Sequence, residues 1–262
     1  MERTFRLDSD EREQLERGGY VVREDVYDAV ELVELRFACE QVVARLTAAR
    51  RRTKLAVGSY MFEIQRQLGT VVKWEPDNPE VIQGVEPLVH LSPRLHALAL
   101  DRRVVEPAAD LVGAEKLSLY TEKLNLKRAH SGGPIVLHQD FPYWKDVCED
   151  ASRIATAMIF LDDSDRANGC LEVAPGSHRD GVRAGRGVEG FGSFEMDAAL
   201  FDPSQLVALE VGAGSVAFFG PFLVHRSQPN RTDADRRALL FSYQPDGWRT
   251  LQEFLALGAK PA

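Results

Sequence analysis

The feature that most constrains this chain is a change of hydrophobic period near Lys116. Beyond it, apolar residues alternate or form short runs, as in "KLSLYTEKLNLK" (116–127), "IATAMIFL" (154–161) and "GSVAFFGPFLVH" (214–225). Clusters of Gly, Pro and Asp separate these runs. Short strands divided in this way are typical of a jelly roll or a small barrel. The sequence therefore predicts a mainly β protein with flanking α-helices, in which N-terminal helices precede a jelly-roll core.

The start of the chain has helical spacing. Asp8 or Ser9 can serve as N-cap of a helix that runs to Arg17 and ends at the glycine pair 18–19. A short strand is expected over 20–25. A long amphipathic helix should follow from about Val26 to Arg52. Its apolar face is predicted from residues at helical spacing, namely Val30, Val33, Phe37, Val42 and Leu46.

Helical patterns return from Pro93 to Leu111, with Gly113 as the expected stop. At 262 residues the chain could form two small domains or one sandwich with helical additions. We expect a single domain over 1–262, with a helical half of about 1–115 and a jelly-roll core of about 116–250. The glycine-rich stretch 179–197 is long for a connection, and we interpret it as a lid or a surface excursion.

Composition excludes several classes of function. The chain has 32 basic and 40 acidic residues, a net charge of −8, so we expect no nucleic-acid partner. No run of apolar residues is long enough for a membrane span, and the charged N-terminus is unlike a signal peptide. The three cysteines form no CxxC pair and indicate a reduced, cytoplasmic protein. The sequence indicates no oligomeric state.

"LHQDFPYW" (137–144) places His138 and Asp140 two residues apart. On a strand both side chains would project from one face, as metal ligands, a catalytic pair or a hydrogen-bonded structural pair. A 2-His-1-carboxylate triad for non-haem Fe(II) needs one more histidine. His225 is the best candidate, because it ends an apolar strand beside a polar loop. The aromatic residues that follow the motif, Phe141, Tyr143 and Trp144, are candidates for the walls of a substrate pocket or for core positions.

A ten-residue polar loop separates His225 from Arg236. If the flanking strands form a hairpin, Arg236 shares the inward face with His225 and Arg237 points outward. A buried guanidinium requires an anion, and Ser227 could donate a hydrogen bond to the same anion. Lys123 and Lys127, on or just after an earlier strand, could contact an anion, but such lysines are more often solvated, so we expect them to lie in solvent.

Several segments together resemble the phytanoyl-CoA dioxygenase family of Fe(II)- and 2-oxoglutarate-dependent oxygenases. They are "GGYVVREDV" (18–26), "PRLHALALDRRVVEPAADLVG" (93–113), "HQDFPYW" (138–144), "NGCLEVAPGSHR" (168–179) and "HRSQPNRTDADRRALLFSYQ" (225–244). The resemblance covers nearly the whole chain. It implies a double-stranded β-helix, the jelly roll of cupin-like proteins, flanked by helices.

The resemblance also implies roles for individual residues. His138, Asp140 and His225 match the family's iron ligands, and Arg236 and Ser227 match the residues that hold the distal carboxylate of 2-oxoglutarate. The carboxylate at position 140 separates the chain from related halogenases. Met158 and the stretch "KRAHSGG" (127–133) depart from phytanoyl-CoA dioxygenase itself, so an acyl-CoA substrate does not follow.

The function implied is oxidation of an unactivated C–H bond of a small molecule, such as a natural-product intermediate, with Fe(II), 2-oxoglutarate and O2. Hydroxylation with release of succinate and CO2 is the expected outcome. The same chemistry can also give epimerisation, desaturation or ring closure. Two alternatives remain: a zinc hydrolase or lyase with the same three ligands, and a non-catalytic jelly-roll binding module.

Overall fold

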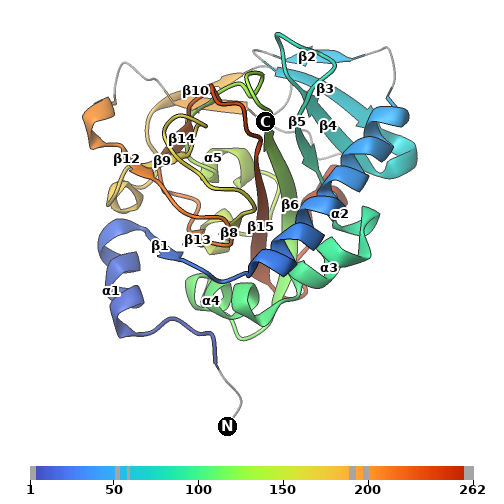
Figure 1. Cartoon of the computed structure of the whole chain (residues 1–262). Helices are drawn as coiled ribbons and strands as arrows, with labels where there is room; N and C mark the ends of the chain where they lie inside the picture. The colour runs from blue at the N-terminus through green and yellow to red at the C-terminus, as the bar shows by residue number, and fades with distance from the viewer. Residues whose placement is uncertain (1–3, 51–53, 58–59, 189–192, 197–200, 257–262) are drawn as a thin grey trace.

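The computed structural model describes residues 4–50, 54–57, 60–188, 193–196 and 201–256 (Figure 1). The helices are α1 (Ser9–Gly18), α2 (Ala29–Ala48), α3 (Pro93–Ala99), α4 (Arg102–Val112), α5 (Phe141–Trp144) and α6 (Leu251–Ala256). The strands before α5 are β1 (Tyr20–Arg23), β2 (Leu55–Val57), β3 (Tyr60–Gln65), β4 (Thr70–Trp74), β5 (Ile82–Glu86), β6 (Leu117–Lys127) and β7 (Ile135–His138). Those after it are β8 (Ala155–Phe160), β9 (Leu171–Val173), β10 (Gly185–Val188), β11 (Ser193–Met196), β12 (Val207–Leu209), β13 (Val216–Phe219), β14 (His225–Ser227) and β15 (Arg236–Pro245).

Two antiparallel sheets form the core. The larger has the strand order β1-β13-β8-β15-β6-β5-β4-β3-β2, and the smaller has the order β12-β9-β14-β7. Phe160 and Phe219 of the larger sheet share a hydrophobic cluster with Leu171 and Val173 of the smaller one, so the sheets pack face to face. This architecture is a jelly roll and confirms the predicted fold class.

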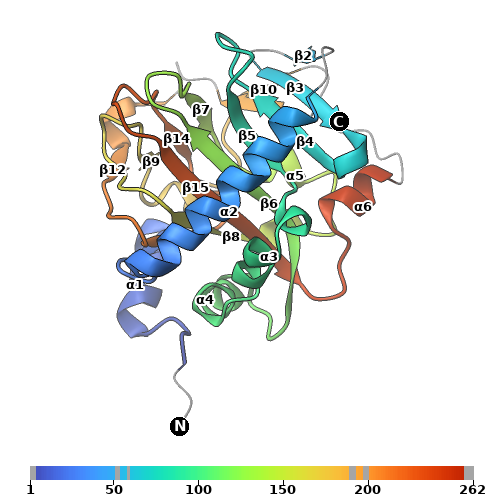
Figure 2. The ribbon, with the colours of Figure 1, turned by 45° about the vertical axis from the view of Figure 1, so that its right-hand side comes forward.

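Helices cover the outer face of the large sheet. Figure 2 shows α2 lying across this sheet, with α3 and α4 beside it. Alternation along β15 explains this arrangement, because Leu239, Phe241 and Tyr243 pack into the cluster that includes the helices. Ala238, on the opposite face, packs between the two sheets. The interior therefore receives Arg236, Ala238, Leu240 and Ser242 from this strand.

The first predicted helix is confirmed. Asp8 is the N-cap of α1 and forms a capping box with Glu11. Gly19 ends the helix with a φ of 84°, which the glycine pair makes accessible.

The helical pattern predicted over 93–111 is confirmed, and it forms two helices, α3 and α4. Leu100 is the C-cap of α3, and Asp101 caps α4 by accepting a hydrogen bond from the backbone N–H of Arg103. Gly113, with a φ of 69°, ends α4 as predicted.

The expectation of a helical first half, over about 1–115, is wrong in part. Residues 55–86 contribute the strands β2 to β5, which extend the large sheet beyond β6. The burial of β4 alternates, with Thr70, Val72 and Trp74 buried and the residues between them partly exposed. This two-residue period is the mark of a strand, so the switch to β structure comes before Lys116.

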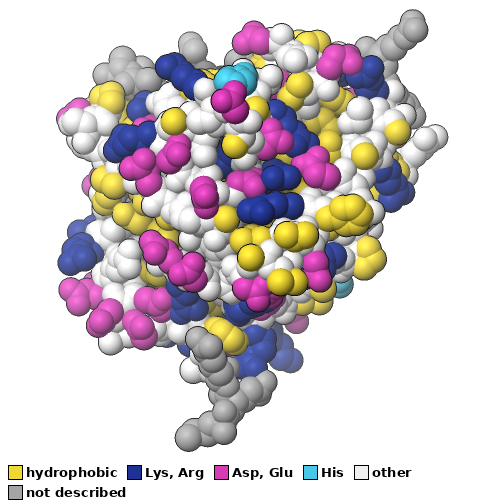
Figure 3. Space-filling view, viewed as in Figure 1, with side chains coloured by type: hydrophobic (Ala, Val, Ile, Leu, Met, Phe, Trp, Pro, Cys, Tyr) yellow, Lys and Arg dark blue, Asp and Glu magenta, His cyan; other side chains and the backbone are white. Residues whose placement is uncertain are grey.

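The buried face of α2 agrees with the predicted one at Val42 and Leu46 and differs from it in the first half of the helix. Val30, Val33 and Phe37 are 70%, 64% and 64% exposed. The buried stripe is formed by Leu32, Leu35, Ala38, Cys39, Val42 and Leu46. Figure 3, in the view of Figure 1, shows exposed hydrophobic side chains among charged ones where α2 runs. Because the helix carries two apolar stripes, its periodicity alone could not select the buried one.

This orientation of α2 predicts that two neighbouring substitutions lower the free energy of unfolding by very different amounts. Leu35→Ala should lower the free energy of unfolding by about 2–5 kcal/mol, because it leaves a cavity in the core. Phe37→Ala should change it by less than about 0.5 kcal/mol, because that ring lies in solvent. Urea titration of both variants measures these values. A larger loss for Phe37→Ala than for Leu35→Ala would show that the helix is turned the other way.

Candidate metal centre and anion site

His138, Asp140 and His225 come together inside the jelly roll. His138 ends β7, His225 begins β14, and the two are direct partners across these antiparallel strands. One ligand atom from each of the three residues lies within 4.8 Å of the other two. The separation of His138 Nε2 from Asp140 Oδ1 is 3.7 Å. The arrangement is compact enough for three side chains to share one ion.

Asp140 reaches the cluster in a way that differs from the strand geometry expected. It lies past the end of β7 and precedes α5, with helical backbone angles of φ −74° and ψ −31°. Gln139, between the two ligands, is fully buried. Its side-chain amide donates to the carbonyls of Gly181 and Phe222, at 2.9 and 2.6 Å. These hydrogen bonds fix the turn that points both neighbours of Gln139 toward His225, a role that sequence patterns did not reveal.

Backbone carbonyls determine the tautomer of both histidines. His138 Nδ1 lies 2.8 Å from the carbonyl of Val136, and His225 Nδ1 lies 2.9 Å from the carbonyl of Leu223. A carbonyl can only accept, so each Nδ1 carries the hydrogen and each Nε2 keeps a lone pair for a metal. Burial, followed by the charge of His225, lowers the pKa of His138 well below its ordinary value. The ring of His138 is therefore held neutral, as a ligand must be.

A second polar group lies on the facing sheet. Arg236, the first residue of β15, is only 1% exposed, and its Nε and Nη1 have no hydrogen-bond partner within the described part of the chain. The hydroxyl of Ser227, on β14, is also buried without a partner there. Buried donors without acceptors are costly, by about 1–3 kcal/mol each. Their presence indicates a site built to receive an anion.

Lys127 adds a second buried cation. It pairs directly with Arg236 across β6 and β15, and its side chain donates to the carbonyl of Gly133 at 2.5 Å. Burial and the charge of Arg236 lower the pKa of Lys127 to about 7. The assignment of this lysine to solvent is wrong, since it is 2% exposed. Its position on a central strand, on the face opposite the core residues Leu124 and Leu126, is the signal that could have placed it inside.

The route by which Arg236 reaches the interior differs from the predicted hairpin. β14 belongs to the small sheet and pairs with β7 and β9, whereas β15 belongs to the large sheet and pairs with β6 and β8. The loop 226–235 thus crosses from one sheet to the other. Gly169, with a φ of 77°, allows this loop to pack closely, because a Cβ there would collide with the carbonyl oxygen of Gln228.

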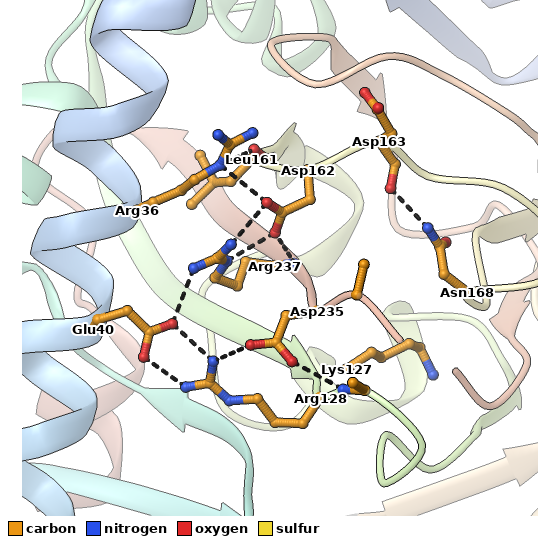
Figure 4. Close-up of polar contacts among 12 residues, drawn as sticks. Arg36, Glu40, Lys127, Arg128, Leu161, Asp162, Asp163, Asn168, Asp235 and Arg237 are labelled. Atoms are coloured by element: carbon orange, nitrogen blue, oxygen red, sulfur yellow. Dashed lines mark hydrogen bonds and ion pairs between the residues drawn. The ribbon is translucent and has the colours of Figure 1, made fainter. Parts of the chain in front are cut away.

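The predicted orientations of the two arginines hold, although Arg237 is not a solvated residue. Figure 4 shows it in a network of ion pairs between α2 and the start of β15. Its guanidinium binds Asp162 with two contacts of 2.8 Å and reaches Glu40 at 3.1 Å. Arg128 links the other side of the network, with contacts of 2.7 Å to Glu40 and 2.6 Å to Asp235. This network clamps the backbone on both sides of Arg236.

The aromatic candidates divide into two groups. Trp144 is 4% exposed and packs edge-on against the buried ring of Tyr120, so it lies in the core. The ring of Tyr143 lies 5.7 Å from that of His138, and Phe141 stacks on Phe222 at 4.5 Å. Both are only partly buried, and Tyr143 stands directly beside the metal cluster.

The predicted lid lies only partly within the described residues. β10 and β11 pair as a hairpin inside the stretch 179–197, while 189–192 and residue 197 are outside the described ranges. Met196 packs against Leu137 on β7, next to His138. Whether the hairpin orders on substrate binding stays a prediction.

Opposite effects on stability are expected at positions 236 and 237. Arg236→Met should raise the free energy of unfolding of the ligand-free protein by about 1–3 kcal/mol, because it removes buried donors without acceptors. Arg237→Met should lower it by about 1 kcal/mol or more, because Asp162 loses its bidentate partner. Denaturant midpoints of the two variants provide the comparison. Equal destabilisation by both changes would contradict the description of Arg236 as an unsatisfied group.

Comparisons with known proteins agree with this geometry. The phytanoyl-CoA dioxygenase family matches residues 15–238. A probable alpha-ketoglutarate-dependent hypophosphite dioxygenase of Stutzerimonas stutzeri is 28% identical, over 84% of this chain and 76% of the relative. An L-proline trans-4-hydroxylase of Streptomyces griseoviridis is 34% identical over 47% of this chain, and the match spans only about half, 52%, of that relative.

The fold is also that of a solved oxygenase. The crystal structure of EctD from S. alaskensis with 2-oxoglutarate and 5-hydroxyectoine superposes with a TM-score of 0.70, at 23% identity, over 94% of this chain and 78% of EctD. The match to the family extends over most of the chain, from α1 to the start of β15. The protein therefore belongs to the phytanoyl-CoA dioxygenase family, a family of iron- and 2-oxoglutarate-dependent oxygenases.

Proposed function

We propose that the protein hydroxylates an unactivated C–H bond of a small molecule, with Fe(II) held by His138, Asp140 and His225 and with 2-oxoglutarate as co-substrate. The observation that carries this proposal is a His–Asp–His cluster facing the same interior as an unsatisfied guanidinium. Two neutral imidazoles and a carboxylate are the donor set of the facial triad for non-haem Fe(II). The buried donors of Arg236 suit one end of a dicarboxylate. The residues present thus fit both groups.

Arg236, Ser227 and Lys127 would hold the distal carboxylate of 2-oxoglutarate. The guanidinium offers its unpaired Nε and Nη1 donors, the hydroxyl a third and the lysine a second positive charge. The three protein ligands leave open positions on the metal, where iron and 2-oxoglutarate together supply the activation of O2. Phe219, whose ring lies 5.3 Å from that of His225, helps to exclude water on the opposite side.

Two other functional interpretations explain fewer of these features. A zinc hydrolase could use the same three ligands, but it would have no use for a buried arginine without a partner. A binding module would not need a complete set of ligands. Hydroxylation is favoured over epimerisation, desaturation or ring closure because the relatives include a proline hydroxylase.

A small-molecule substrate and a cytoplasmic location complete the proposal. The relatives named above act on hypophosphite and L-proline, both small. All three cysteines are free thiols, and Cys39 and Cys170 are buried, which suits a reducing compartment. No described helix has the length and hydropathy of a membrane span. The acidic net charge argues against nucleic acid as a partner.

Removal of a single ligand tests the metal assignment. His138→Ala and Asp140→Ala should each abolish succinate formation and lower the bound iron well below one per chain, without loss of the fold. His130→Ala is the matched control, since that histidine is exposed and pairs only with Asp233. Iron content, succinate yield and melting temperature are measured together. A ligand variant with normal iron and normal turnover would exclude this triad.

The low pKa of Lys127 predicts a pH dependence for 2-oxoglutarate binding. With a pKa of about 7, set by burial and by Arg236, this lysine is mostly neutral at pH 8 in the free protein. A bound carboxylate raises the pKa, so binding at pH 8 should take up about one proton. Through this group the affinity should be fully present below pH 7 and fall as the pH rises above it. Glu75 and Lys73 also act on Lys127, in opposite directions.

Calorimetry of the Mn(II)-loaded protein in buffers of different ionisation enthalpy counts these protons. Lys127→Met should bind 2-oxoglutarate more weakly at pH 7 and without proton uptake at pH 8. Uptake that persists in this variant would assign the proton to another group.

A further inference from the structure

Three further polar residues, Lys73 on β4 and Lys123 and Asn125 on β6, face the interior. On β6, Asn125 pairs with Ala238 and Lys123 pairs with Leu240, so both share the inward face of β15. On β4, Lys73 pairs with Gly84 of β5, which in turn pairs with Asn125. Cross-strand partners project from the same face of a sheet. Lys73 and Lys123 therefore line the interior, and sequence patterns assigned neither of them to a site.

Lys123 lies too far along the barrel to help bind the anion held by Arg236. Lys123 and Lys127 are four positions apart on one strand, so their backbones lie about 13 Å apart. Its neighbours are instead Glu86, at 3.5 Å, and Asp140, whose charge acts on the ammonium group. The charges of Lys123 and Lys73 also contribute to the low pKa of His138, after burial and His225. Both lysines thus lie near the metal ligands, with Lys123 toward Asp140.

Among the described residues, these two cations have one carboxylate at ion-pair distance. It is Glu86, which lies beside Lys123 and also accepts a hydrogen bond of 2.5 Å from the hydroxyl of Thr121. The ammonium of Lys73 lies 3.6 Å from the centre of the Tyr60 ring. Burial and the charge of Lys123 lower the pKa of Lys73 to about 7, while the charges of Glu75 and Glu86 act in the opposite direction from further away. Within the described part of the chain, Lys73 is thus left without an anion at ion-pair distance.

A ligand can reach these two lysines. The side chain of Lys123 is 32% exposed, although it projects from a central strand, and Lys73 is partly exposed as well. Aromatic rings stand beside the two histidines, Phe219 next to His225 and Tyr143 next to His138. A molecule that enters next to the proposed metal ligands would therefore meet these rings and the two lysines.

We propose that Lys73 and Lys123 form a second anion subsite, which binds a carboxylate or phosphonate group of the primary substrate beside the metal and apart from Arg236. This inference rests on the proposed function, because it places the substrate next to the iron ligands. An anion held on one wall fixes the distance of the remaining substrate atoms from the metal. It thereby selects which C–H bond is oxidised.

The test uses the Mn(II)-loaded protein saturated with 2-oxoglutarate, so that the Arg236 site is filled. Acetate and methylphosphonate are the anionic probes, and acetamide is the neutral analogue of acetate. Paramagnetic relaxation of the methyl protons reports binding near the metal, and the Zn(II)-loaded protein gives the diamagnetic reference. At least one anion should show saturable relaxation, and acetamide should show none. The stronger of the two anions identifies the chemical group that the substrate carries.

Variants then assign the binding to the lysines. Lys73→Met and Lys123→Met should each weaken the anion by about ten- to a hundredfold. Lys123→Met should leave 2-oxoglutarate binding intact. Lys73→Met should retain it or tighten it slightly, because it removes the repulsion between Lys73 and Lys127. Lys123→Arg should keep most of the affinity. Lys116→Met removes the same charge from an exposed position and should change nothing. Retained 2-oxoglutarate binding also shows that each variant is folded.

The outcomes separate this inference from the proposed function. If the wild-type protein does not bind 2-oxoglutarate, the proposed function fails and the inference fails with it. If 2-oxoglutarate binds but the methyl protons of neither anion show paramagnetic relaxation, the proposed subsite is wrong. The same holds if both lysine variants bind the anion as tightly as the wild type does. In either case the oxygenase proposal stands.

Discussion

The buried guanidinium of Arg236 is the constraint on which much of the structure depends. It is 1% exposed, with unpaired donors, and it sits beside a second buried cation, Lys127. Such a pair is unfavourable in a ligand-free interior, so the surrounding structure must hold it in place. The ion pairs of Arg237, Asp162, Glu40 and Arg128 do so from the outer face of the sheet (Figure 4). The ion pairs on the outer face of β15 thus stabilise the strand that carries the unpaired guanidinium of Arg236 on its inner face.

The two sheets also contribute different kinds of side chain to the interior. The small sheet supplies the proposed metal ligands His138 and His225, and the large sheet supplies the cations that face them. Arg236 and Lys127 lie at one level of the barrel, and Lys123 lies about 13 Å further along the same strand. If both cationic groups bind anions, co-substrate and substrate are kept apart by charge as well as by shape. Their arrangement would explain how two anionic molecules can flank one metal without exchanging places.

Local patterns in the sequence predicted the parts of the site that depend on residue type and strand parity. The opposite orientations of Arg236 and Arg237 follow from alternation along a strand. The resemblance to a known family grouped His138, Asp140 and His225, although Asp140 lies past the end of β7 and not on the strand. The crossing of the chain from β14 in the small sheet to β15 in the large sheet could not be predicted from local patterns, because sheet membership is decided by long-range pairing. The predicted inward orientation of Arg236 agrees with its burial, although the connection proposed for it was wrong.

Two further misreadings have the same physical origin. α2 carries two apolar stripes, and only packing against the sheet decides that Leu35 is buried and Phe37 exposed. Lys127 is a charged residue on a partly apolar strand, β6, a pattern that usually indicates solvent. Its burial is evident only once the second sheet closes over it. Tertiary context, rather than propensity, decided each of these cases.

The most direct test of the account compares 2-oxoglutarate with 2-oxopentanoate, which has the same chain length and keto acid but lacks the distal carboxylate. Equilibrium titration of the Mn(II)-loaded protein gives both dissociation constants. The account predicts that 2-oxoglutarate binds about ten- to a hundredfold more tightly, and that Arg236→Met removes most of this difference. Equal affinities for the two acids in the wild-type protein would contradict it, because the buried guanidinium would then have no part in binding the co-substrate.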